Sequence, residues 1–207
     1  RDGVILAASK NAPSRLLVPD SMRKIFEIDA HIATTASGLI ADARRLVDMA
    51  RLEAQRHRLA YSEPASVEMI TRNLCDLMQV YTQYGGIRPF GVALLIGGIQ
   101  DDKPVLYEAE PSGALTGFKA DAIGTGKKEV EEFFEKEYKD SIGVDEGISL
   151  AISALKKTSE GLNPDRVEIS VATTKKREFT ILSEKEMTRL SNELNRGYLM
   201  IQGPHQA

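Results

Sequence analysis

The eleven residues from Tyr81 to Gly91 (YTQYGGIRPFG) constrain the fold of this chain more than any other segment. They follow a helical pattern and lead directly into an apolar run. Gly85 and Gly86 can adopt backbone angles that other residues avoid, and Pro89 holds the preceding Arg88 in an extended conformation. The segment is therefore predicted to be a stiff connection of one shape between a helix and a buried strand.

Apolar residues at three- and four-residue intervals predict helices in four places. These helices are Leu39 to Ala54, Val67 to Tyr81, Glu129 to Tyr138 and Asp145 to Lys157. Ser183 and Glu186 have the spacing of a capping box, which predicts the start of a further helix. The inner face of that helix would carry Met187, Leu190 and Leu194.

Short runs rich in β-branched and apolar residues predict the strands. They are Val4 to Ala8, Arg15 to Val18, Lys24 to Asp29, His31 to Thr35, Val92 to Ile99, Val105 to Glu108, Ala114 to Lys119, Val167 to Val171 and Phe179 to Ile181. The strand at Val167 alternates apolar and polar residues and is expected to be half-buried. Glu110 to Gly113, with proline second and glycine fourth, predicts a type I turn.

Strands thus come in blocks, with helices in pairs between them. This order predicts an α+β fold, a four-layer αββα sandwich of two stacked antiparallel sheets with helices outside. A ferredoxin-like or doubly wound fold would need single helices alternating with strands. We expect one domain over residues 1–195, followed by a tail at residues 196–207 whose middle is apolar.

Composition narrows the class of protein. The chain has 207 residues, of which 42% are hydrophobic and 28% charged, as in ordinary globular proteins. A net charge of −3 disfavours a nucleic-acid partner. Cys75 is the one cysteine, which we expect to be a buried small hydrophobe in a reducing compartment. No apolar run reaches the ~20 residues of a membrane span, and residues 1–4 lack a signal-peptide layout. We expect a cytoplasmic protein with no membrane partner.

Two candidate sites for metal or phosphate are weak. Gly124 to Lys127 (GTGK) lacks the spacing and the following hydroxyl residue of a phosphate-binding loop, so it is interpreted as a tight turn into a helix. His31, His57 and His205 are isolated, and no pair has the spacing of metal ligands. We therefore expect no metal and no cofactor.

The predicted architecture is the one that N-terminal-nucleophile hydrolases use, in which a terminal Thr, Ser or Cys attacks with its own amine as the base. Arg1, the first residue given, has no such group. Thr34 and Thr35 lie inside one predicted strand, and Thr173-Thr174 near the end of another, so neither pair offers a free amine. We expect no catalytic residue in this chain.

Seven segments together resemble the α-type subunits of archaeal-style 20S proteasomes, from Val4 to about Leu194. They are Lys24 to Asp29, Ser37 to Arg44, Arg51 with Glu53 to Gln55, Tyr81 to Gly91, Pro111 to Gly113, Lys119 to Gly124 and Phe134 to Tyr138. Each is weak alone, but their order and spacing are highly specific.

The resemblance implies the αββα sandwich and a catalytically silent subunit. Such subunits form a heptameric ring that caps the ring of threonine-protease β subunits and docks regulatory ATPases. It also implies ring contacts by the signature loop, namely Tyr81, Tyr84, Gly85, Gly86, Arg88, Pro89, Phe90 and Gly91.

The family further implies a pocket for the C-terminal tail of an activating ATPase, matching Lys24, Gly38 and Leu39. A lysine ammonium can neutralise a terminal carboxylate, and the amides at a helix start add donors. Without the resemblance, Lys24 would be an ordinary exposed strand lysine.

Family members carry a further strand, an N-terminal helix and a gate segment upstream of the strand at Val4. No part of this sequence corresponds to them, so no gate residue is assigned. Two other functions stay open. The chain could be an active N-terminal-nucleophile amidohydrolase or peptidase whose true terminus is hidden, or a free-standing binding module that forms no ring.

Overall fold

The computed structural model describes residues 2–10, 16, 23–158, 167–183 and 186. Its strands form two sheets in which all neighbours are antiparallel, one of order β2-β3-β4-β5-β6 and one of order β1-β7-β8. The strands are β1 (Gly3–Ser9), β2 (Ile25–Asp29), β3 (Ile32–Gly38), β4 (Val92–Gln100), β5 (Lys103–Ala109), β6 (Leu115–Gly117), β7 (Val167–Thr173) and β8 (Phe179–Ile181).

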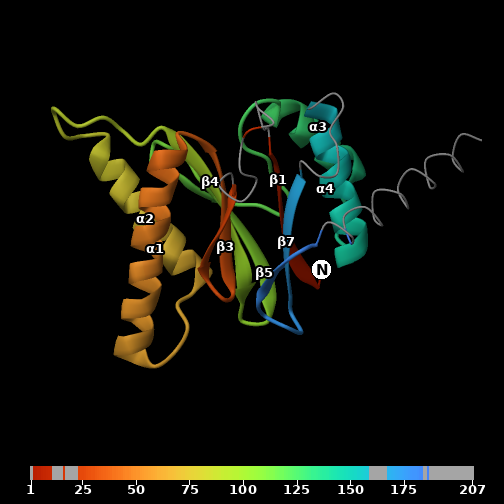
Figure 1. Cartoon of the computed structure of the whole chain (residues 1–207), viewed down its shortest axis with the longest axis horizontal. Helices are drawn as coiled ribbons and strands as arrows, with labels where there is room; N and C mark the ends of the chain where they lie inside the picture. Colours follow the sequence, from red (N-terminus) through yellow and green to blue (C-terminus); the bar gives the residue numbers. More distant parts are fainter. Residues whose placement is uncertain (1, 11–15, 17–22, 159–166, 184–185, 187–207) are drawn as a thin grey trace, which may run out of the picture.

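Helices cover the outer faces of this stack, as Figure 1 shows. On one side, α1 (Ile40–Tyr61) and α2 (Val67–Tyr81) lie against the five-stranded sheet. On the other, α4 (Val144–Thr158) packs on β1, and α3 (Lys127–Glu137) packs beside α4. The predicted αββα sandwich is confirmed.

Clusters of buried apolar side chains lie at each interface of the sandwich. Between the helical pair and the five-stranded sheet, the largest fully buried residues are Ile32, Leu46, Ile70, Met78, Leu94 and Ile96. Small side chains on the inner face of α1 let the helix approach the sheet closely; they are Ala43, Ala50 and Ala54. The apolar residues that recur at helical spacing in the sequence are therefore the ones that form this core.

The turn and the cap that the sequence predicts are present, and Ser66 adds a further cap, for α2, by accepting the Met69 N–H at 3.1 Å. The Gly113 N–H donates to Glu110 O at 2.9 Å, as a type I turn requires. Ser183 and Glu186 bond reciprocally, as the capping box predicts. The inner-face residues expected on the helix that follows, Met187, Leu190 and Leu194, and also His205, lie outside the described residues.

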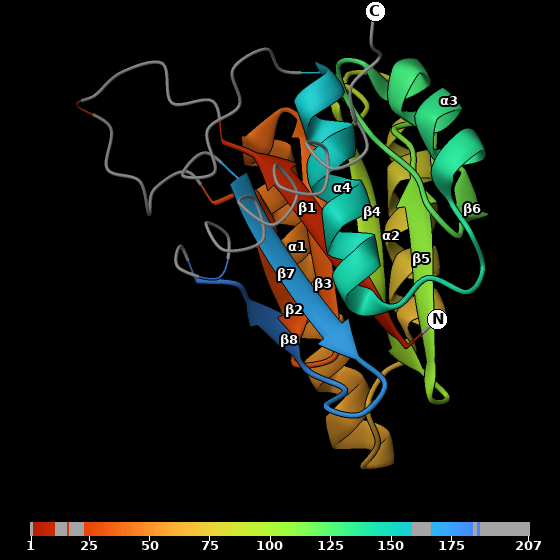
Figure 2. The same cartoon turned by 90° about the vertical axis from the view of Figure 1, so that its right-hand side faces the viewer.

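Three strand predictions need correction. The strand expected at Val167 to Val171 is buried on both faces, because β7 is the middle strand of its sheet and lies between α4 and the second sheet. Figure 2 shows β7 between β1 and β8, with α4 in front. The strand expected over Ala114 to Lys119 is only Leu115–Gly117. Of Arg15 to Val18, the described residue Leu16 is 94% exposed and in a turn.

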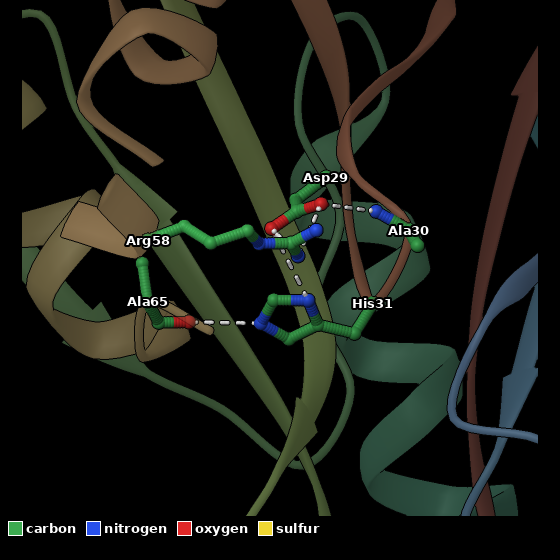
Figure 3. A network of polar contacts seen from close by, with 5 residues as sticks. All are labelled: Asp29, Ala30, His31, Arg58 and Ala65. Atoms are coloured by element: carbon green, nitrogen blue, oxygen red, sulfur yellow. Dashed lines mark hydrogen bonds and ion pairs between the residues drawn. The ribbon is translucent and has the colours of Figure 1, made fainter. Parts of the chain in front are cut away.

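A polar network ties the far end of α1 to the β2–β3 turn (Figure 3). Arg58 donates to both carboxylate oxygens of the buried Asp29, at 3.0 and 2.8 Å. Nε2 of His31 lies 2.8 Å from Ala65 O, so this nitrogen carries the proton that it donates. The contacts agree with the prediction that His31 is structural.

Candidate functional site

The signature loop is fastened to the first turn of α1 by one carboxylate. Asp42 accepts two hydrogen bonds from the Arg88 guanidinium, at 2.6 and 2.8 Å, and a third from the Gly91 N–H at 2.9 Å. These donors, the Arg88 guanidinium first, lower the pKa of Asp42 to about 2. The Arg88 charge is thus neutralised by a residue 46 positions away.

Gly38 and Leu39 contact the same end of the loop. The Leu39 N–H donates to Gly91 O at 2.8 Å. Gly38 has a φ of +119°, and a Cβ on it would overlap the carbonyl oxygen of Gly91. Only glycine permits this approach of β3 to the loop. The structure therefore brings Gly38 and Leu39, from the predicted pocket, together with Arg88 and Gly91, from the signature loop.

A contact between two tilted aromatic rings joins the two ends of the loop. The ring centroids of Tyr81 and Phe90 are 4.6 Å apart, and Phe90 is buried in the core. The tip is different, because Tyr84 and Ile87 are exposed and Gly85 and Gly86 have open space where a Cβ would be. The tip extends beyond the end of α2 in Figure 1. The loop thus has a fixed base and an uncovered tip.

Lys24 lies at the same end of the five-stranded sheet as Gly38. It comes just before β2, whose first residue, Ile25, pairs with Thr35 of β3. Lys24 is half-buried, and its backbone N–H donates to Glu168 at 3.0 Å. The simple expectation of an exposed strand lysine therefore does not hold.

A cavity of about 590 Å³ runs along β1, between that strand, α3, α4 and residues 118–125. Lys24 is among the residues that line it, as is the buried Asp121. Among the residues that the structure describes, neither carboxylate oxygen of Asp121 has a hydrogen-bond partner. Burial raises the pKa of Asp121 to about 6, and the nearby Ala122 amide offsets this only in part. Beside it, Lys127 and Glu108 form an ion pair at 2.6 Å.

Residues 124–127 are the tight turn that the sequence predicts. Gly126 precedes α3 with a φ of +81°, and the Lys127 N–H donates to Gly124 O. The Lys127 ammonium is held by Glu108. Within the described residues, no group of three His, Cys, Asp or Glu side chains could hold a metal ion.

Cys75 is buried, as predicted, and burial raises the pKa of its thiol to about 11. A thiol in this environment is unreactive. Over the same described ranges, no helix is both long and apolar enough to cross a membrane.

Sequence reasoning missed Asp42 and Asp121 as site residues. The sequence shows Asp42 near the start of a predicted helix and Arg88 in the loop, but only the fold brings the two together. Asp121 carries no local signal, because its burial depends on how residues 118–123 approach β1.

Comparison with known proteins connects this geometry to a family. The family model for proteasome subunits matches residues 1–173. The proteasome subunit alpha of Pyrococcus abyssi is 51% identical over 194 residues, which are 94% of this chain and 74% of that protein. The proteasome subunit alpha of Methanocaldococcus jannaschii is 49% identical over 190 residues, which are 92% of this chain and 73% of that protein. The chain belongs to the proteasome subunit family, among its α subunits.

Proposed function

We propose that this chain is a catalytically silent subunit of the heptameric outer ring of the 20S core particle. In this ring it contacts the β subunits and docks the C-terminal carboxylate of a regulatory ATPase at Lys24, Gly38 and Leu39. The observation that supports this function best is the set of hydrogen bonds from Arg88 and Gly91 to Asp42. Together with the bond from the Leu39 N–H to Gly91 O, they join the signature loop to Gly38 and Leu39.

The start of α1 is suited to a carboxylate. Its N-cap, Leu39, makes no side-chain capping bond to the described residues, and the Asp42 and Ala43 amides donate to Leu39 O, so the amides of Ile40 and Ala41 are the candidate donors. Those amides carry the positive end of the helix dipole. The nearest acidic group of the turn, Asp42, is already neutralised by Arg88. The Lys24 ammonium would add a full positive charge at the same end of the sheet.

The internal threonines support catalytic silence. Thr34 is fully buried in the middle of β3, and its hydroxyl donates to Leu95 O at 3.0 Å. Thr35 is buried beside it in the same strand. Neither has the free amine that an N-terminal nucleophile requires.

Replacing Lys24 by alanine is expected to weaken binding of an activator C-terminal peptide by about 10-fold or more, because a charge-assisted contact is lost. The ring should stay intact. Fluorescence anisotropy with a labelled peptide measures the affinity, and native mass spectrometry measures the ring. Lys103→Ala is the matched control, since Lys103 is an exposed lysine at the opposite end of the same sheet. Equal affinities for the two variants would remove Lys24 from the site.

A threonine-directed electrophile, added to core particles that contain this chain, is expected to label the β subunits and leave this chain unmodified. Intact-mass analysis of the separated subunits gives the result. Stoichiometric labelling of this chain would establish instead an active N-terminal-nucleophile hydrolase with a hidden terminus. A chain that stays monomeric with β subunits present would point to a free-standing binding module.

A further inference from the structure

Glu168 is a buried carboxylate between the two sheets, only 5% exposed, on β7. Its Oε2 accepts the backbone N–H of Lys24 at 3.0 Å. The ammonium of Lys10, just after β1, lies 3.9 Å from the same oxygen. A carboxylate removed from water is costly unless it is neutralised and hydrogen-bonded, so these two contacts explain why it is tolerated.

The contact fixes the backbone of Lys24 from outside its own sheet. The β2–β3 ladder begins at Ile25, opposite Thr35, so it does not include Lys24. Glu168 supplies the hydrogen bond for this residue from 144 positions later in the chain. The starting point of the lysine side chain is thereby set by β7.

We propose that Glu168 is a positioning residue, which holds the Lys24 backbone so that its ammonium meets the activator carboxylate. This inference rests on the proposed docking function. A flexible lysine recognises a carboxylate selectively only when its backbone is fixed relative to the other donors, here the amides at the start of α1. Glu168 itself touches no part of the activator.

Two substitutions of Glu168 separate geometry from charge. Glu168→Gln keeps the length of the side chain and an acceptor oxygen but removes the charge. Glu168→Asp keeps the charge but is one methylene shorter, which withdraws the acceptor from the Lys24 N–H. The probe is a short peptide with the ATPase C-terminal sequence, used with a free carboxylate and as the C-terminal amide. The ratio of the two affinities isolates recognition of the carboxylate.

In assembled core particles we expect Glu168→Asp to reduce this ratio about fivefold or more, and Glu168→Gln to stay within about twofold of wild type. Native mass spectrometry confirms that each ring is intact. The positioning role is overturned if both variants keep the wild-type ratio, or if Gln reduces it and Asp does not. Lys24→Ala is measured alongside. If it leaves the ratio unchanged, the docking function itself fails; if it lowers the ratio while Glu168→Asp does not, only the positioning role fails.

Discussion

Gly38→Ala is expected to destabilise the protein by about 3–5 kcal/mol, the largest effect of any single methyl group at the site. The φ of +119° is strained for an L-residue, and the added Cβ would overlap Gly91 O. Relief requires β3 to separate from the loop, which breaks the Leu39–Gly91 hydrogen bond. The thermal midpoint should fall by roughly 8 °C or more, and activator-peptide binding should be lost.

Two glycines in the signature loop, Gly85 and Gly86, provide graded controls for the Gly38 substitution. Gly86 has a φ of +83° but open space around it, so Gly86→Ala should cost only about 1 kcal/mol. Gly85 has neither a positive φ nor a close neighbour, and Gly85→Ala should be neutral or stabilising by about 0.5 kcal/mol. Equal midpoints for all three variants would contradict a close contact between β3 and the loop.

The sequence predicts the sandwich because the residues that form its cores recur at regular intervals along the chain. Apolar residues at helical spacing in α1 and α2, and runs of apolar residues in β4, are enough to place helices outside two sheets. The stiffness of the loop also follows from local chemistry, since Pro89 and the glycines act within a few residues. Local rules therefore account for the layers and for the shape of the connection.

Residue pairs that are distant in the chain were beyond these rules. Asp42 and Arg88 are 46 positions apart, and Lys24 and Glu168 are 144 apart. The alternation in β7 predicts a half-buried strand, and this prediction is wrong for the same reason. Glu168 and Ser170 look like solvent-facing residues, yet both are buried between the sheets. There Glu168 meets the Lys24 amide, and Ser170 donates to Thr180 O at 3.4 Å. Polar residues in an alternating pattern can therefore face the interior where hydrogen-bond partners are available there.

The buried Asp121, beside the cavity along β1, should make the stability of the protein depend on pH. Its pKa in the folded protein, about 6, lies above the ordinary value of 3.8. Between these values the folded state binds more protons than the unfolded state, so this group's stabilising contribution is full below pH ~4 and is lost as pH rises through 6. Burial is the main cause, and the Glu108 charge adds to it while Lys127 opposes it. At neutral pH the ionised carboxylate should therefore cost up to about 2–3 kcal/mol.

Asp121→Asn removes this cost, because an amide cannot ionise. At pH 7.5 the variant should melt about 5 °C above wild type. The difference should shrink as pH falls through 6 and vanish only below pH ~4, where the folded and the unfolded wild type are both protonated. Differential scanning calorimetry across this range measures both. Asp76→Asn, at an exposed position on α2, is the control and should change stability by less than about 0.5 kcal/mol throughout. A pH-independent difference for Asp121→Asn would contradict a raised pKa and would mean that the carboxylate is as well solvated in the folded protein as in the unfolded chain.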